Sequence, residues 1–196
     1  IGDFLVLKMD SINLILYKFS YCLRKDWDGG CDMFKLFKKK EKSVDFYSIC
    51  NGKVIPIENV PDNVFANKML GNGVGFELAD STIYAPCDGE IMMIANTKHA
   101  IGLKSINGAE LLIHIGLDTV NLNGLGLHPL IKSGDKIKKG QPLLKLDLEV
   151  MEENKICLTT PMIITNGEGY KLDIIKQNEK VTLSDIIFSV INERGK

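Results

Sequence analysis

The clearest indication of the fold class is the segment Ala100-Ile-Gly-Leu-Lys-Ser-Ile-Asn-Gly-Ala-Glu-Leu-Leu-Ile-His-Ile115. It holds two short apolar runs without the 3.6-residue period of a helix. The Asn107-Gly108 dipeptide between them readily reaches the positive φ angles of a tight turn. Residues 100–106 and 110–115 are therefore predicted to pair as an antiparallel β-hairpin.

Short runs of the same kind recur along the rest of the chain, bounded by turn residues. The further predicted strands are Lys53–Ile57, Thr82–Ala85, Glu90–Ile94, Pro142–Leu146 and Met162–Thr165. Asn51-Gly52, Asp88-Gly89 and Asn123-Gly124 are predicted to make further hairpin turns. Only Asp62–Met69 and Asp147–Asn154 favour helices. The predicted fold class is therefore all-β, an antiparallel β-sandwich or barrel with at most short helices.

Two pairs of similar segments point to a pseudo-duplicated architecture. Residues 50–57 (CNGKVIPI) are similar to residues 87–94 (CDGEIMMI), and residues 72–76 (NGVGF) to residues 123–127 (NGLGL). Each pair combines a turn dipeptide with apolar residues, as a duplicated strand–turn unit would. The spacings differ between the pairs, so the pairs are not evidence of a solenoid.

Composition excludes several classes of protein. The 24 basic and 25 acidic residues leave a formal net charge of −1, so the chain as a whole does not attract nucleic acid. Its five cysteines are scattered without a C-x-x-C pair, which excludes a disulfide framework and a zinc knuckle. No apolar run reaches the roughly 18 residues that a membrane span requires. We therefore expect a cytoplasmic domain that binds no nucleic acid.

The N-terminal residues differ from the rest. Residues 1–32 mix apolar and charged residues without a period, and codons for the residues just before Met33 can contain a ribosome-binding sequence. We expect residues 1–32 to be an untranslated or non-native leader, residues 33–43 a flexible basic tail, and residues 44–196 the domain. Within the tail, residues 33–42 (MFKLFKKKEK) carry three apolar anchors among lysines, which favours weak contact with an anionic membrane surface.

One histidine lies within the predicted hairpin. Strand alternation places Leu112, His114 and Gly116 on one face, with Asp118 expected beyond them. Apolar surroundings disfavour a charged imidazole, which keeps it neutral and nucleophilic near neutral pH. Gly116 is expected to leave room for another molecule beside it.

A second histidine precedes the hairpin. Thr97 and His99 share a face, and the hairpin is expected to bring His99 and His114 onto neighbouring strands. A second imidazole within reach can donate a hydrogen bond to a phosphoryl oxygen or an oxyanion. The third histidine, His128, lies in a glycine-rich loop and is expected to be incidental.

Several strings occur in the order that is typical of one known family. The longest is residues 110–127 (ELLIHIGLDTVNLNGLGL). The others are Val60-Pro61-Asp62 with Val64-Phe65-Ala66, Ala85-Pro86 with Asp88-Gly89, Thr97 with His99-Ala100, and residues 134–140 (GDKIKKG). Together they resemble the glucose-type IIA components of the bacterial phosphoenolpyruvate-dependent sugar phosphotransferase system. The resemblance runs from about Val44 to about Ile191 and implies a β-sandwich or barrel.

The resemblance implies a phosphotransferase component that carries phosphoryl groups between proteins. His114 matches the histidine that accepts a phosphoryl group on Nε2 from the phosphocarrier HPr and passes it to the IIB domain of a glucose-family sugar permease. His99 matches the second active-site histidine, and Thr97 matches the residue whose hydroxyl orients it. We expect Asp118, beside the site, to act in partner recognition or local electrostatics.

The resemblance also implies an apolar surface that receives both partner proteins. Its expected members are Val64, Phe65, Met69 and Leu70, with Leu112 and Gly116 beside His114. This surface is smaller than is usual, because Asn63 replaces a β-branched residue and Ala95, Leu112 and Leu127 stand at positions that are often aromatic. No cofactor is required. His99 and His114 are expected to form at most an incomplete zinc site, shared with a partner's carboxylate.

Two alternatives from other classes stay open. In a regulatory binding module, phosphorylation of His114 would switch docking on metabolic enzymes or transporters, because added negative charge disfavours contact with an apolar surface. A zinc peptidase of the lysostaphin kind uses an H-x-x-x-D pair, which His114 and Asp118 match, but the chain lacks the H-x-H motif that supplies a third ligand. The sequence has no glycine-rich nucleotide loop that would indicate direct use of ATP.

Overall fold

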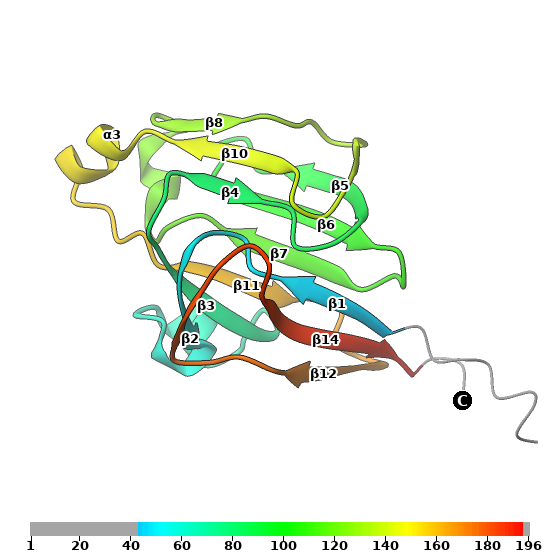
Figure 1. Ribbon diagram of the computed structural model, residues 1–196. Coiled ribbons are helices and arrows are strands. Elements are labelled where there is room, and N and C mark those ends of the chain that lie inside the picture. The colour runs from blue at the N-terminus through cyan, green and yellow to red at the C-terminus, as the bar shows by residue number, and fades with distance from the viewer. Residues whose placement is uncertain (1–42, 194–196) are drawn as a thin grey trace, which may run out of the picture. The chain divides into compact units, whose positions relative to one another are not determined.

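Antiparallel strands dominate the structure, a computed structural model that describes residues 43–193 (Figure 1). The expected leader, and all of the expected basic tail except Ser43, lie outside these described residues. The strands form three sheets with only short helices between them, which confirms the predicted fold class. Among the described residues, no helix is long and apolar enough to cross a membrane.

The largest sheet has eight strands in the order β13-β2-β3-β11-β7-β6-β5-β9, and every neighbouring pair is antiparallel. Its strands are β2 (Gly52–Pro56), β3 (Asn72–Leu78), β5 (Gly89–Ile94), β6 (Ala100–Ser105), β7 (Glu110–His114), β9 (Lys136–Ile137), β11 (Thr160–Ile164) and β13 (Glu179–Val181). β6 and β7 form the predicted hairpin, with Ala100 opposite His114. At its turn Gly108 has a φ angle of +88°, as the Asn-Gly pair predicts.

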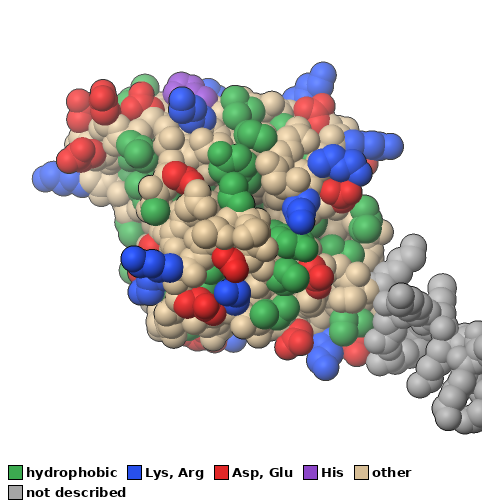
Figure 2. All heavy atoms as spheres, viewed as in Figure 1, with side chains coloured by type: hydrophobic (Ala, Val, Ile, Leu, Met, Phe, Trp, Pro, Cys, Tyr) green, Lys and Arg blue, Asp and Glu red, His purple; other side chains and the backbone are tan. Residues whose placement is uncertain are grey.

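Two three-stranded sheets complete the fold. The first has the order β1-β14-β12, and the second has the order β4-β10-β8. Their strands are β1 (Ser43–Tyr47), β14 (Ile186–Asn192), β12 (Tyr170–Ile174), β4 (Thr82–Tyr84), β10 (Pro142–Leu146) and β8 (Leu127–Pro129). Ser43 in β1 lies opposite Ile191 in β14. On the face shown in Figure 2, side chains of both charge signs are interspersed, and a stripe of hydrophobic side chains crosses β8, β10 and β4.

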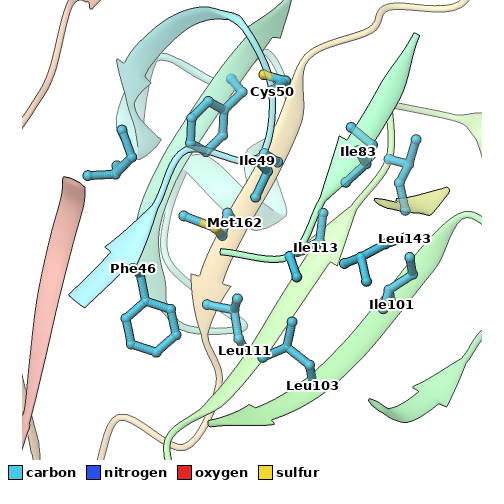
Figure 3. Packing of buried hydrophobic residues seen from close by; sticks show 14 of the residues in the cluster. Phe46, Ile49, Cys50, Ile83, Ile101, Leu103, Leu111, Ile113, Leu143 and Met162 are labelled. Carbon is cyan, nitrogen blue, oxygen red and sulfur yellow. The ribbon is translucent and has the colours of Figure 1, made fainter. Parts of the chain in front are cut away.

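The main core lies between these sheets. Leu111 and Ile113 of β7 point into it and belong to one cluster with Ile83 of β4 and Leu143 of β10 (Figure 3). All four side chains are 1% exposed or less. A shift of one residue in the pairing of β7 would turn its apolar residues away from this core, so the core fixes the register that places His114.

Within residues 43–193, four short helical turns connect the strands: η2 (Ile57–Asn59), α2 (Asn63–Ala66), η3 (Thr119–Leu122) and α3 (Leu148–Glu153). The two predicted helices are α2 and α3, each shorter than expected. Asp62 and Asp147 cap them, because each carboxylate accepts hydrogen bonds from the backbone N–H groups two and three residues further on.

The segment of η2 and α2 packs on the face of the large sheet that points away from the main core. A second apolar cluster forms there from Ile55, Ile57, Val60, Phe65, Leu117 and Ile163, with Leu112 packed against it. Gly75 of β3 makes this approach possible, because a Cβ atom there would lie 2.7 Å from Val60 Cγ2. The glycines of β3 therefore serve close packing.

The three further predicted hairpin turns, at Asn51-Gly52, Asp88-Gly89 and Asn123-Gly124, are wrong. Gly52 and Gly89 begin β2 and β5, and neither takes a positive φ angle. A Cβ atom would lie 2.2 Å from the Glu77 carbonyl oxygen at the first and 2.3 Å from the Lys104 carbonyl oxygen at the second. Glycine is required at both because the neighbouring strand comes so close.

This shared role of Gly52 and Gly89 gives the repeat between residues 50–57 and 87–94 a structural counterpart. The other pair of similar segments has none. Residues 72–76 lie in β3, whereas residues 123–127 lead from the end of η3 into β8. Asn123 and Gly124 both have positive φ angles there, so this dipeptide turns the chain without pairing two strands.

Candidate functional site

The β6–β7 hairpin brings His99 and His114 together, as the sequence predicts. His99 immediately precedes β6, and His114 ends β7. Their ring centroids lie 5.0 Å apart with the ring planes inclined at 63°. The backbone holds this arrangement, because Ile115 N–H donates to the carbonyl oxygen of His99 at 2.8 Å. Two imidazoles therefore meet at one end of the hairpin.

A backbone hydrogen bond fixes the protonation of the His114 ring. Nδ1 lies 2.8 Å from the carbonyl oxygen of Gly116. Because a carbonyl oxygen only accepts, Nδ1 carries the proton and Nε2 of the neutral ring keeps its lone pair. Burial lowers the pKa of His114 below its ordinary value, although the Gly116 hydrogen bond and the Asp62 and Asp118 carboxylates act in the opposite direction. In this neutral form the ring can act as a nucleophile at Nε2.

The ring of His99 is held by Thr97. The threonine Oγ1 lies 2.5 Å from Nδ1 of His99. Burial, and then the positive charge that His114 can carry, lower the pKa of His99. When the hydroxyl donates to Nδ1, the neutral ring carries its proton on Nε2 and can act as a hydrogen-bond donor there. The two imidazoles then offer one lone pair and one N–H group.

Phe65 connects the histidines to the second apolar cluster. Its ring lies 5.1 Å from the His114 ring in an edge-to-face arrangement, and only 5% of Phe65 is exposed. Leu112, two residues before His114 on the same face of β7, packs against the same cluster. The predicted surface residues Phe65 and Leu112 thus line the wall of the site.

The other predicted surface residues are more exposed. Val64 lies in α2, and Met69 and Leu70 follow this helix. Their exposed fractions are 39%, 72% and 47%. The Met69 N–H donates to the Val64 carbonyl oxygen at 3.0 Å, which closes the turn from Val64 to Met69, and Leu70 follows directly. They form an apolar rim around α2.

Two carboxylates flank His114. Asp118 is exposed, has a φ angle of +60°, and makes no side-chain cap to η3. Asp62 caps α2 and is not among the predicted site residues. Its position directly before Val64 and Phe65, at a predicted helix start, is the signal that could have identified it.

Gly116 plays a different part from the one expected. Its φ angle is +65°, and a Cβ atom would lie 2.9 Å from Thr119 Cγ2 and 3.2 Å from the Cys157 carbonyl oxygen. Protein atoms fill the space where a side chain would point. The expectation that this space is left for another molecule is wrong; glycine permits the backbone turn that aims its carbonyl at His114.

The site offers few ligands for a metal ion. No group of three or more His, Cys, Asp and Glu side chains suitable for a metal occurs within residues 43–193. Two imidazoles make up half of a tetrahedral zinc site. Any zinc ion held by both histidines would therefore need further ligands from a partner.

Comparisons with known proteins point to one family. The family model for the EIIA 1 component of the phosphoenolpyruvate-dependent sugar phosphotransferase system matches residues 44–170. The glucose-specific EIIA component of Staphylococcus epidermidis is 40% identical over 154 residues, which cover 79% of this chain and 88% of that protein. The glucose permease IIA of Mycoplasma capricolum superposes with a TM-score of 0.71 and 32% identity, covering 76% of this chain and 96% of that one.

A longer relative contains the same region as one part. The glucose-specific EIICBA component of Staphylococcus saprophyticus is 46% identical over 156 residues, which cover 80% of this chain and 23% of that protein. The match therefore concerns about a quarter of the longer protein.

Proposed function

Because this chain belongs to the EIIA 1 family of the phosphoenolpyruvate-dependent sugar phosphotransferase system, we propose that it carries phosphoryl groups in the uptake of glucose-family sugars. The donor is the phosphocarrier HPr, and the acceptor is the IIB domain of a glucose-family permease. The reaction takes place in the cytoplasm. The observation that carries this proposal is the His114 ring, with its Nδ1 proton held by Gly116 and its Nε2 lone pair free to attack.

His114 is the nucleophile of the first step. Its Nε2 attacks the phosphorus, the bond from phosphorus to the donor's nitrogen breaks, and that nitrogen keeps the electron pair. No proton has to leave His114, because the attacking nitrogen carries none. The hydrogen bond from Nδ1 to the Gly116 carbonyl stabilises the positive charge that the ring gains.

His99 supports the transferred group. With the Thr97 hydroxyl donating to Nδ1, Nε2–H of His99 can donate to a phosphoryl oxygen on its neighbour. The loose transition state of phosphoryl transfer requires positioning and charge stabilisation more than acid–base chemistry. His99 supplies both for transfer onward to the IIB domain.

Both partners dock on the apolar rim. Docking on Val64, Met69 and Leu70 removes water from the neighbouring histidines, which protects the N–P bond until the next acceptor arrives. Asp62 and Asp118 place negative charge next to this rim, so a cationic side chain of a partner would be favoured there.

The zinc-peptidase alternative does not hold, because the chain belongs to a phosphotransferase family and has no H-x-H motif. Binding of regulated enzymes or transporters on the same rim is compatible with phosphoryl transfer. Phosphorylated His114 would add charge to the docking surface and weaken such binding.

The proposal is tested by following labelled phosphate from phosphoenolpyruvate, through the general enzyme and HPr, to the full chain. His114→Ala should remove all label. His99→Gln should still be labelled but should pass the label to the IIB domain slowly. His128→Ala, which changes an exposed histidine on β8, is the matched control and should behave as the wild type.

Two results would contradict the proposal. One is a wild-type chain that is correctly folded by circular dichroism and takes up no label. The other is label that persists in His114→Ala.

A further inference from the structure

Two buried threonines hold the loop that follows His114. Thr119 and Thr160 are both 0% exposed. The Thr119 hydroxyl donates to the Ile115 carbonyl oxygen at 2.6 Å. The Thr160 hydroxyl accepts from the Gly116 N–H at 3.1 Å. The Ile115 carbonyl and the Gly116 N–H belong to one peptide group, so both polar atoms of that group are bound by threonine hydroxyls.

The next peptide group is bound at both ends as well. The Leu117 N–H donates to the Cys157 carbonyl oxygen at 2.7 Å, and the Gly116 carbonyl accepts from His114 Nδ1. Rotation of the Ile115–Gly116 peptide group would change the direction of the adjoining Gly116 carbonyl. That carbonyl is the only group in this chain of contacts that touches the imidazole, so the threonines act on the ring through the backbone.

The segment that supplies Thr160 is itself fixed. The Thr160 hydroxyl donates its own proton to the Leu158 carbonyl oxygen at 3.0 Å, which leaves its lone pairs to face the Gly116 N–H. Thr160 also begins β11, the strand that pairs with β7 and β3. Its hydroxyl therefore has a defined position and a defined direction.

We propose that Thr119 and Thr160 are positioning residues for phosphoryl transfer, which clamp the Ile115–Gly116 peptide group and so hold His114 with its proton on Nδ1 and its lone pair on Nε2. The inference rests on the proposed function of His114 as the phosphoryl acceptor. Neither threonine hydroxyl is hydrogen-bonded to the imidazole. Loss of either hydroxyl would free one end of the Ile115–Gly116 peptide group, which would let the adjoining Gly116 carbonyl change direction and let the ring take up the other tautomer or turn.

The variants Thr119→Val and Thr160→Val remove one hydroxyl each at nearly constant side-chain volume. Thr119→Ser and Thr160→Ser keep the hydroxyl and should restore the wild-type behaviour. Thr159→Val is the matched control, because Thr159 is also buried but its hydroxyl accepts from the Cys157 thiol rather than from the clamped peptide group.

Two measurements on folded protein test the clamp. The first is the rate of phosphorylation by phospho-HPr, which should fall about 10- to 100-fold in each valine variant, the size seen when hydrogen-bond partners that orient metal-binding histidines are removed. The second is nitrogen-15 NMR of the His114 ring without any partner. It should show the Nδ1–H tautomer in the wild type, the serine variants and Thr159→Val, and a mixture of tautomers in Thr119→Val and Thr160→Val.

The clamp is overturned if the valine variants keep the wild-type rate, or lose rate while the His114 tautomer stays unchanged. Failure of the proposed function is distinguishable from this, because it appears as a wild-type chain without label. The tautomer comparison still decides the clamp in that case, since it needs no phosphoryl donor.

Discussion

The two faces of β7 meet different surroundings. Leu111 and Ile113 point into the main core between the sheets, where they are 1% and 0% exposed. Leu112 and His114 point to the opposite face, where only the small cluster beneath α2 covers them in part. Alternation along one strand thus separates His114, the proposed phosphoryl acceptor, from the neighbouring side chains that stabilise the core, because they lie on opposite faces.

The largest expected effect on stability comes from the core face. Ile113→Ala should lower the free energy of unfolding by about 2–5 kcal/mol, because it removes buried methyl groups and leaves a cavity. Urea unfolding measures this loss. Ile106→Ala, the same change at a 72% exposed position of the same hairpin, is the control and should stay within about 0.5 kcal/mol of the wild type. Folded Ile113→Ala that no longer accepts phosphate would show that the two faces are not separate.

Leu112, the neighbour of Ile113 on the other face of β7, should affect partner docking more than stability. Leu112→Ala should cost only about 1 kcal/mol of stability, because Leu112 is half-buried. It should also raise the KM for phospho-HPr about fivefold with little change in kcat, since the lost contact concerns docking rather than the transition state. Steady-state kinetics at several phospho-HPr concentrations separates the change in KM from the change in kcat. A fall in kcat alone would contradict a docking role.

Acidification should lower the free energy of unfolding through His99 and His114. Burial lowers the pKa of both His99 and His114 in the folded state, so below about pH 6.5 the unfolded chain binds more protons than the folded one. This contribution to stability is complete above the unfolded pKa and is lost as the pH falls through it. Unfolding free energies compared with those of the His99→Gln/His114→Gln double variant between pH 8 and pH 5 should show the wild type losing more stability at the acidic end. If the unfolding free energies of the two proteins changed equally with pH, this role of the histidines would be contradicted.

The smallest expected effect concerns Asp118. Asp118→Asn should lower the pKa of His114 further, because the carboxylate favours the charged imidazole, while stability stays within about 0.5 kcal/mol of the wild type. An NMR titration of His114 reads the shift. Asp62→Ala should lower the same pKa but should also cost about 1 kcal/mol, since it removes the cap of α2. An upward shift in either variant would reject this electrostatic role.

Strands with strong local patterns were predictable from sequence, and strands whose residues serve long-range packing were not. The β6–β7 hairpin follows from its apolar runs and the Asn107-Gly108 turn. β3 does not, because its glycines resemble turn residues until the neighbouring strand and Val60 are in place. Gly52 shows the same ambiguity, since only the position of the Glu77 carbonyl reveals why glycine stands there.

The residues of the site also differ in how far the sequence predicts them. Its two histidines could be paired from the sequence because one hairpin carries both. Thr160 could not be found, because it lies 44 residues from its partner Gly116 and its hydroxyl gains meaning only when β11 pairs with β7. Asp62 is intermediate, since its place before a predicted helix was visible but its effect on His114 depends on how α2 lies on the sheet.

The pairing of β1 with β14 has a consequence for how this domain can be joined to others. Ser43 and Ile191 face each other across adjacent strands, so the two ends of the described unit leave the fold at one corner. A domain of this kind can be appended or inserted through a single attachment point without stretching its sheets, and circular permutation is favoured for the same reason. A linker to another module would leave the domain at this corner and would not have to wrap around it.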